Sequence, residues 1–252
     1  MQRRTYLGLA ATGVIGSVAG CTSAANGSEY PPYPDAETIE LSGDGPDTTE
    51  RFEITQDGPT LVDAEHMGSD NFIVVLDDPD IETDDETNES NESNVTTEST
   101  ETNESTDEAE PDPVVASVVD AIGPYDGRSL LPVSTGSYVL SVLEADAEWT
   151  ATIYDLPSYE DGVGIDLPLK RESEQYDVIG PINFGEQTET EFSFSATGPG
   201  LHRVFLTDRD GADSLTVAQF NGEDEQTVTR PISGVGYVEI LSNRSWTFEL
   251  ST

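Results

Sequence analysis

The chain has 252 residues, of which 51 are acidic and 10 basic, so its formal net charge is −41. A field this negative repels phosphate backbones, which argues against a nucleic-acid-binding protein. The single cysteine excludes both a disulfide framework and a cysteine-ligated zinc site.

The N-terminus carries the pattern of an export signal. Arg3 and Arg4 precede an uncharged, weakly apolar stretch, and small residues lead into Cys21, the only cysteine. The stretch is too short to span a bilayer, and it reads as a signal peptide. Small residues before a lone cysteine resemble a lipoprotein signal, and the paired arginines resemble the signal for export of folded proteins. We expect residues 1–20 to be removed and Cys21 to be lipidated. The alternative is an ordinary signal peptide that happens to contain a cysteine.

The rest of the chain predicts β-structure. Residues 21–35 read as a tether, because small polar residues are followed by a proline-rich end. Beyond them, short alternating runs with β-branched and aromatic residues are separated by Gly and Pro turns, and only 114–122 is ambiguous. The predicted fold class is all-β, with two tandem antiparallel β-sandwich modules, immunoglobulin-like or jelly-roll-like. We expect these modules at 36–157 and 178–252, joined by a linker at 158–177.

An internal duplication supports two modules. Phe52, Gly58 and Leu61 recur as Phe192, Gly198 and Leu201 at an offset of 140, whereas later matches, including Tyr138 with Tyr237, have an offset of 99. The acidic tract 77–112 lies between the matches with an offset of 140 and those with an offset of 99. With 16 acids, no base and almost no apolar residue, it is expected to be a disordered insertion in a loop of the first module.

The acidity extends beyond this tract, since 35 acids remain against 10 bases without it. Acidity throughout a chain, with nine Arg against one Lys, is typical of haloarchaeal proteins, because hydrated carboxylates keep a surface soluble once salt screens their repulsion. The chain resembles haloarchaeal secreted surface lipoproteins of undetermined function, in which a β module occurs singly or duplicated, and the resemblance covers both modules. The residues that carry this resemblance are Phe52, Gly58, His66-Met67-Gly68, Asn71-Phe72, Gly123-Pro124-Tyr125-Asp126-Gly127, Gly136-Ser137-Tyr138 and Trp149.

Six Asn-x-Ser/Thr sequons are candidates for N-glycosylation, and four of them lie in the acidic tract. The six are Asn26, Asn88, Asn91, Asn94, Asn103 and Asn243. Accidental matches are common in a segment rich in Ser and Thr, so the alternative is a plain polyelectrolyte loop.

Few residues point to chemistry. Asp208, Asp210 and Asp213 surround Gly211 and form a weak calcium candidate, although an ordinary Asp-Gly turn explains them more simply. No other cofactor is expected. His66 and His202 are interpreted as structural rather than catalytic, since nothing places them beside a nucleophile. Trp149, Trp246, Tyr138 and Tyr237 are interpreted as core anchors rather than as a sugar-stacking platform.

These patterns favour a lipid-anchored cell-surface protein on the outer face of the cytoplasmic membrane. It is expected to be a monomer and a non-enzymatic binding or structural module of a halophilic envelope. Its expected partners are the membrane, through the lipid on Cys21, and an envelope protein or glycan, but no nucleic acid. The alternatives are an extracellular solute- or calcium-binding protein and, less favoured, an envelope hydrolase with an unrecognised triad.

Overall fold

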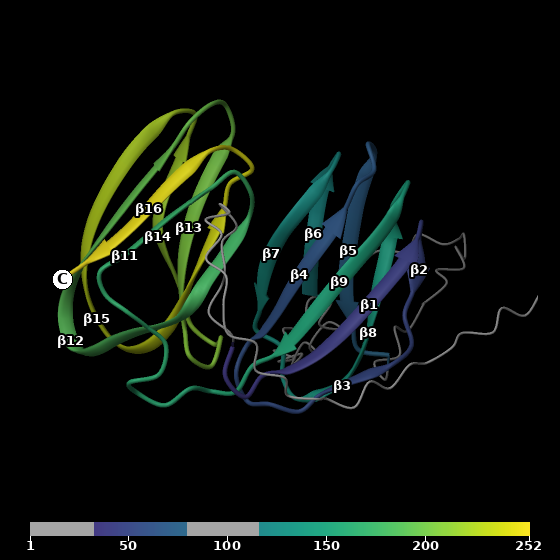
Figure 1. The fold of residues 1–252 in the computed structure, drawn as a ribbon, viewed down its shortest axis with the longest axis horizontal. Coiled ribbons are helices and arrows are strands. Elements are labelled where there is room, and N and C mark those ends of the chain that lie inside the picture. The colour runs from purple at the N-terminus through teal and green to yellow at the C-terminus, as the bar shows by residue number, and fades with distance from the viewer. Residues whose placement is uncertain (1–32, 80–115) are drawn as a thin grey trace, which may run out of the picture. The chain divides into compact units, whose positions relative to one another are not determined.

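A computed structural model describes residues 33–79 and 116–252. All regular secondary structure in these ranges is β, and no described helix is long and apolar enough to cross a bilayer. The predicted all-β class is therefore confirmed. We call the strands β1–β9 the first module and the strands β10–β16 the second module (Figure 1).

The first module is a sandwich of two sheets. Their strand orders are β1-β9-β4-β7 and β2-β8-β5-β6, and β3 also pairs with β8. This eight-strand order, with β2 and β3 sharing one position, is that of a jelly roll. Alternating apolar residues from both sheets fill the space between them, with Phe72, Leu140 and Trp149 at the centre. The strands are β1 (Glu37–Asp44), β2 (Asp47–Thr48), β3 (Phe52–Ile54), β4 (Thr60–His66), β5 (Asn71–Asp77), β6 (Ala116–Ile122), β7 (Tyr125–Leu131), β8 (Gly136–Glu144) and β9 (Glu148–Asp155).

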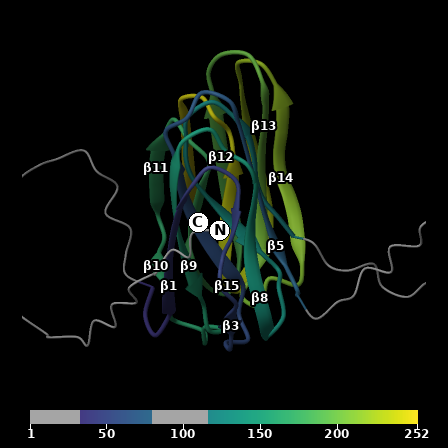
Figure 2. The ribbon, with the colours of Figure 1, turned by 90° about the vertical axis from the view of Figure 1, so that its right-hand side faces the viewer.

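The second module forms one continuous sheet in the order β11-β16-β12-β15-β13-β14, and β10 pairs in parallel with β12. The two long strands β12 and β15 run through both layers of a sandwich. Bulges between Ile179 and Thr188 divide β12 into two segments, and each segment pairs with a different part of β15. Its core contains Phe192, Phe194 and Phe248. The strands are β10 (Ile165–Asp166), β11 (Leu169–Ser173), β12 (Asp177–Ala196), β13 (Leu201–Asp208), β14 (Ser214–Asn221), β15 (Asp224–Leu241) and β16 (Trp246–Ser251). Figure 2 shows β13 and β14 side by side, as their pairing requires.

With β12 and β15 each divided in two, the second module has the strand order of the first. One sheet has the order β11-β16-β12-β15 and uses residues 188–196 of β12 and 224–232 of β15. The other sheet has the order β12-β15-β13-β14 and uses residues 177–185 of β12 and 234–241 of β15. Even a bulge recurs, since the register shifts between Val74 and Val75 and again between Val204 and Phe205. Both halves are therefore jelly rolls of the same topology.

The pairings correct the offset assigned to the first half of the repeat. His66 and Ala196 lie opposite Trp149 and Trp246, respectively, so β4 corresponds to β12 at an offset of 130 and not to β13 at 140. The offset of 99 holds for β6 and β7. The β5–β6 connection is thus 130 − 99 = 31 residues longer than its counterpart between β13 and β14.

The expected linker 158–177 is also corrected. It contains β10 and β11, and β11 is the edge strand of the second module, equivalent to β1. The tether expected at 21–35 is also corrected, because its last residues belong to the folded unit. Tyr33 packs against Tyr154 with ring centroids 5.1 Å apart, and the carbonyl of Pro34 accepts a 2.7 Å hydrogen bond from the Tyr159 hydroxyl.

A third apolar cluster joins the modules. Leu61 and Leu130 point out of the first sandwich and pack with Val178, Val235 and Tyr237 of the second. Because both modules contribute buried side chains to this cluster, residues 33–252 form one unit.

Candidate functional site

Most residues predicted from the N-terminal and acidic patterns lie outside the described ranges. These are Arg3, Arg4, Cys21, Asn26, Asn88, Asn91, Asn94 and Asn103. The sequon residue Asn243 is described, and it lies exposed in the turn between β15 and β16.

The aspartate loop folds as a hydrogen-bonded turn. The amide of Asp213 donates to the Asp208 carboxylate at 3.3 Å, the amide of Gly211 donates to the Asp208 carbonyl at 3.2 Å, and Asp210 accepts a hydrogen bond from the Ser158 hydroxyl. In the two described ranges no group of three or more His, Cys, Asp or Glu side chains is placed to hold a metal ion. The geometry is that of the simpler turn.

The two histidines lie in different cores. His202 is fully buried, and its Nδ1 lies 2.9 Å from the hydroxyl of Ser242, which is itself 1% exposed. Its Nε2 has no hydrogen-bond partner among the described residues, so no carboxylate completes a triad there.

His66 stacks on Phe72 at 4.5 Å. Its Nε2 lies 3.3 Å from the Asp146 carboxylate, although the geometry is not that of a hydrogen bond. The amide of Ser69 donates to Asp146 and lowers the pKa of that carboxyl, so Asp146 is oriented by the loop rather than by the histidine.

The four aromatic residues are all buried, as expected of core anchors. Trp149 and Trp246 are equivalent, and each indole N–H donates to a backbone carbonyl just beyond the edge strand, Gly45 at 3.0 Å and Gln175 at 2.8 Å. Tyr138 and Tyr237 are not equivalent. When the strands of the two modules are aligned by their pairing, the two tyrosines are one position apart, so their side chains point to opposite faces of the sheet. Tyr138 lies in the core of the first module, and Tyr237 lies in the cluster between the modules.

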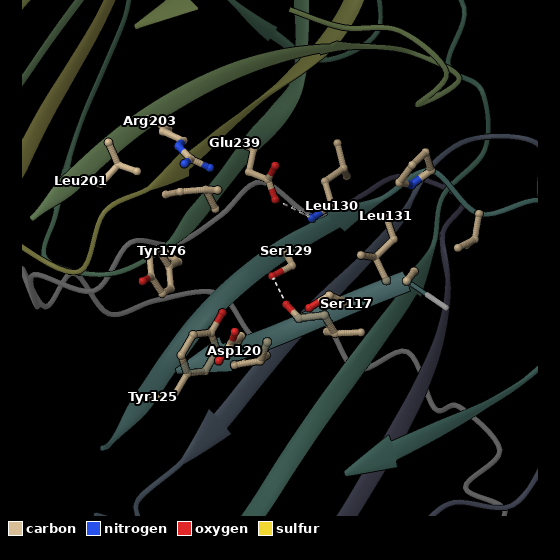
Figure 3. Close-up of a pocket in the computed structure, with 16 residues that line it drawn as sticks. Ser117, Asp120, Tyr125, Ser129, Leu130, Leu131, Tyr176, Leu201, Arg203 and Glu239 are labelled. Atoms are coloured by element: carbon tan, nitrogen blue, oxygen red, sulfur yellow. Dashed lines mark hydrogen bonds between the residues drawn. The ribbon is translucent and has the colours of Figure 1, made fainter. Parts of the chain in front are cut away.

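A cleft lies between the modules, and we call it the inter-module cleft. Its volume is about 900 Å³, and β6, β7, β13 and β15 line it (Figure 3). Its wall is mainly apolar but carries Asp120, Arg203 and Glu239. The lining residues are Ala116, Ser117, Val118, Val119, Asp120, Tyr125, Ser129, Leu130, Leu131, Pro132, Val133, Tyr176, Leu201, Arg203, Glu239 and Leu241.

The cleft lies where the two sheets of the first module end. β6 and β7 are edge strands, and an uncovered edge offers unpaired backbone groups. Here other groups cap them. The amide of Leu130 donates to the Glu239 carboxylate at 3.1 Å, the amide of Arg128 donates to the Tyr176 carbonyl at 3.2 Å, and the Ser129 hydroxyl donates to the Val118 carbonyl at 2.7 Å.

Burial raises the pKa of Glu239, and the hydrogen bond from Leu130 offsets part of that rise. Burial also raises the pKa of the Tyr125 phenol, so this group stays neutral at ordinary pH. The cleft thus offers one guanidinium, carboxyl groups and neutral hydroxyls against an apolar wall, which is the composition of a small-molecule binding site.

Sequence reasoning did not single out Arg203 or Glu239. Each is the polar member of an alternating strand, a position that normally faces water. Only the packing of the second module against the first turns these positions into a cleft.

No family model and no curated protein matches the chain. Among solved structures, the chain is similar to one from a study entitled "Life in the extremes: atomic structure of Sulfolobus Turreted Icosahedral Virus", with 10% sequence identity and a TM-score of 0.21. The match covers 94% of this chain and 98% of that one. At this TM-score the similarity does not bear on function.

Proposed function

We propose that the protein is an exported, lipid-anchored component of a halophilic cell envelope, with a non-catalytic double jelly roll that binds a ligand outside the cell. The inter-module cleft carries the binding part of this proposal, because it has a volume of about 900 Å³ and combines apolar walls with a few polar groups. The signal pattern that ends at Cys21 carries the anchoring part.

The length of the tether supports an extracellular binding role. The folded unit begins at Tyr33, and eleven residues lie between Cys21 and Tyr33, which makes twelve residue steps along the chain. At about 3.3 Å per residue in an extended chain, this spacer reaches roughly 40 Å. That length lets the double module stand clear of a membrane surface while it remains attached.

Fractionation of cells that express the full chain tests the anchor. Wild type should sediment with membranes and dissolve in detergent, whereas Cys21→Ser should appear in the medium or remain unprocessed. Cys21→Ala is a second variant with the same expectation. A Cys21→Ser protein of mature size that stays membrane-bound would refute lipid anchoring.

A cleft variant, Leu201→Trp, tests the binding role separately, because Leu201 lines the cleft and is 47% exposed, so the larger side chain can fill the cleft without entering a core. It should remain membrane-bound and lose ligand binding. Unchanged binding in a folded Leu201→Trp protein would remove the cleft from the proposal.

A further inference from the structure

Arg203 is the cation of the inter-module cleft, and its donors are not all used. Its Nε is buried and has no hydrogen-bond partner among residues 33–79 and 116–252. Two other arginines form ion pairs: Arg128 contacts Asp63 at 2.8 Å, and Arg209 contacts Asp161. A buried donor on a charged group destabilises a protein unless an acceptor meets it. A planar guanidinium with a free edge fits a carboxylate.

Glu239 lies beside it on the same face of the sheet. Arg203 pairs with Leu241 in the register of β13 and β15, so Glu239 is its diagonal neighbour two residues along. Such neighbours are about 7–8 Å apart at the backbone, and Figure 3 shows both side chains directed into the cleft. The structure has no ion pair between them. One carboxyl oxygen of Glu239 accepts the amide of Leu130 at 3.1 Å, and the other remains available.

An apolar surface adjoins this charged pair. Leu201 is 47% exposed on the same strand as Arg203, and Leu241, Leu131 and Val133 continue the wall. A simple organic anion would match Arg203 but would face the carboxyls of Glu239 and Asp120. A simple amine would match these carboxyls but leave Arg203 without an acceptor. A molecule with adjacent ammonium and carboxylate groups matches both.

We propose that the inter-module cleft binds an α-amino acid with an apolar side chain. The carboxylate contacts the Arg203 guanidinium, the ammonium contacts the Glu239 carboxylate, and the side chain lies on the leucine wall. This assignment rests on the proposed binding function and adds the class of ligand. No covalent step is involved, so the amino acid is released unchanged.

Three matched probes test the assignment by calorimetry on the full chain in detergent and molar KCl. L-leucine carries both charges, 4-methylpentanoate lacks the ammonium, and 3-methylbutylamine lacks the carboxylate. Leucine should bind at least about tenfold more tightly than either analogue, because each lost charged hydrogen bond contributes about a factor of ten or more. Equal affinity for leucine and 4-methylpentanoate would refute the proposal that the cleft recognises both charged groups of an amino acid.

Variants assign the contacts. Arg203→Gln should weaken leucine binding about ten- to hundredfold, and Arg203→Lys should restore part of it. Glu239→Gln should weaken leucine binding but leave 4-methylpentanoate unaffected or tighter. Arg230 is an exposed arginine outside the cleft, so Arg230→Gln is the matched control and should bind as wild type.

A melting curve on each variant separates misfolding from lost contact. A folded Arg203→Gln protein with wild-type affinity would refute the site. If none of the three probes binds although Cys21→Ser releases the protein, the ligand assignment is wrong and the anchoring proposal stands. If leucine binds but the Cys21→Ser protein stays on the membrane, the anchoring proposal is wrong and the ligand assignment stands.

Discussion

The β5–β6 connection offers a direct test of the equivalence between the modules. Residues 78–114 of the first module occupy the place of residues 208–213 in the second, as the paired registers of Leu76 with Ala116 and Leu206 with Leu215 require. We predict that replacing 78–114 with the six residues Asp208–Asp213 leaves the fold intact and raises its stability. Loop closure scales with the logarithm of length, so shortening 37 residues to six should contribute about 1.6 kcal/mol.

For a unit of this size, that gain corresponds to a rise in melting temperature of about 3–6 °C. The measurement is thermal unfolding in molar KCl, where charge repulsion is screened. A control with a neutral Gly/Ser loop of 37 residues separates length from charge, since the swap also replaces fifteen acidic residues with three aspartates and one arginine. The control should melt near wild type in molar salt. A swapped protein less stable than wild type by more than about 1 kcal/mol would refute the reasoning, because the acidic segment would then make stabilising contacts.

Three further predictions concern the core, the cleft and the charge. Trp149→Phe and Trp246→Phe should each lower the free energy of unfolding in denaturant titrations by about 1–3 kcal/mol, since each removes an indole hydrogen bond to a backbone carbonyl and makes a buried side chain smaller; unequal losses would count against equivalent roles. Because burial raises the pKa of Glu239, the native state binds the carboxyl proton more tightly than the unfolded state does. The free energy of unfolding should therefore fall as the pH rises from 4.5, the ordinary pKa of a glutamate, through the raised pKa of Glu239. Glu239→Gln should flatten this dependence in melts taken from pH 4 to 8, and an unchanged slope would show that Glu239 is not its source. At a net charge of −41, stability should rise steeply from low to molar KCl, and a flat curve would contradict the halophilic proposal.

The sequence was a good guide to the fold class and a poorer guide to the register. Alternation around Phe72 and Leu140, together with Gly and Pro turns, indicated two sandwiches correctly because a half-buried strand requires that pattern. The repeat was misaligned at Phe52 because Phe-x-Ile and Phe-x-Phe look alike at the same spacing. Strand pairing, which decides the equivalence, is a long-range property that such matches do not contain.

Residues 158–177 show a different limit. They contain few large apolar residues, and this composition predicts a linker. Instead, β11 is an edge strand whose residues are half-buried or exposed. An edge strand with one open side needs little apolar surface. The cleft was beyond prediction for a related reason, since Arg203 and Glu239 acquire their surroundings only from the docking of a second module.

The caps on β7 have a consequence for the order of events during synthesis. The amides of Arg128 and Leu130 are covered by Tyr176 and Glu239, and Glu239 is made 109 residues after its partner Leu130. Until the second half of the chain leaves the ribosome, the first jelly roll has an open edge that can recruit a strand from a neighbouring molecule. Nascent chains can therefore associate with one another through this edge until β15 has been synthesised and has folded against it. A truncated product that ends between the modules would keep that edge and is expected to aggregate.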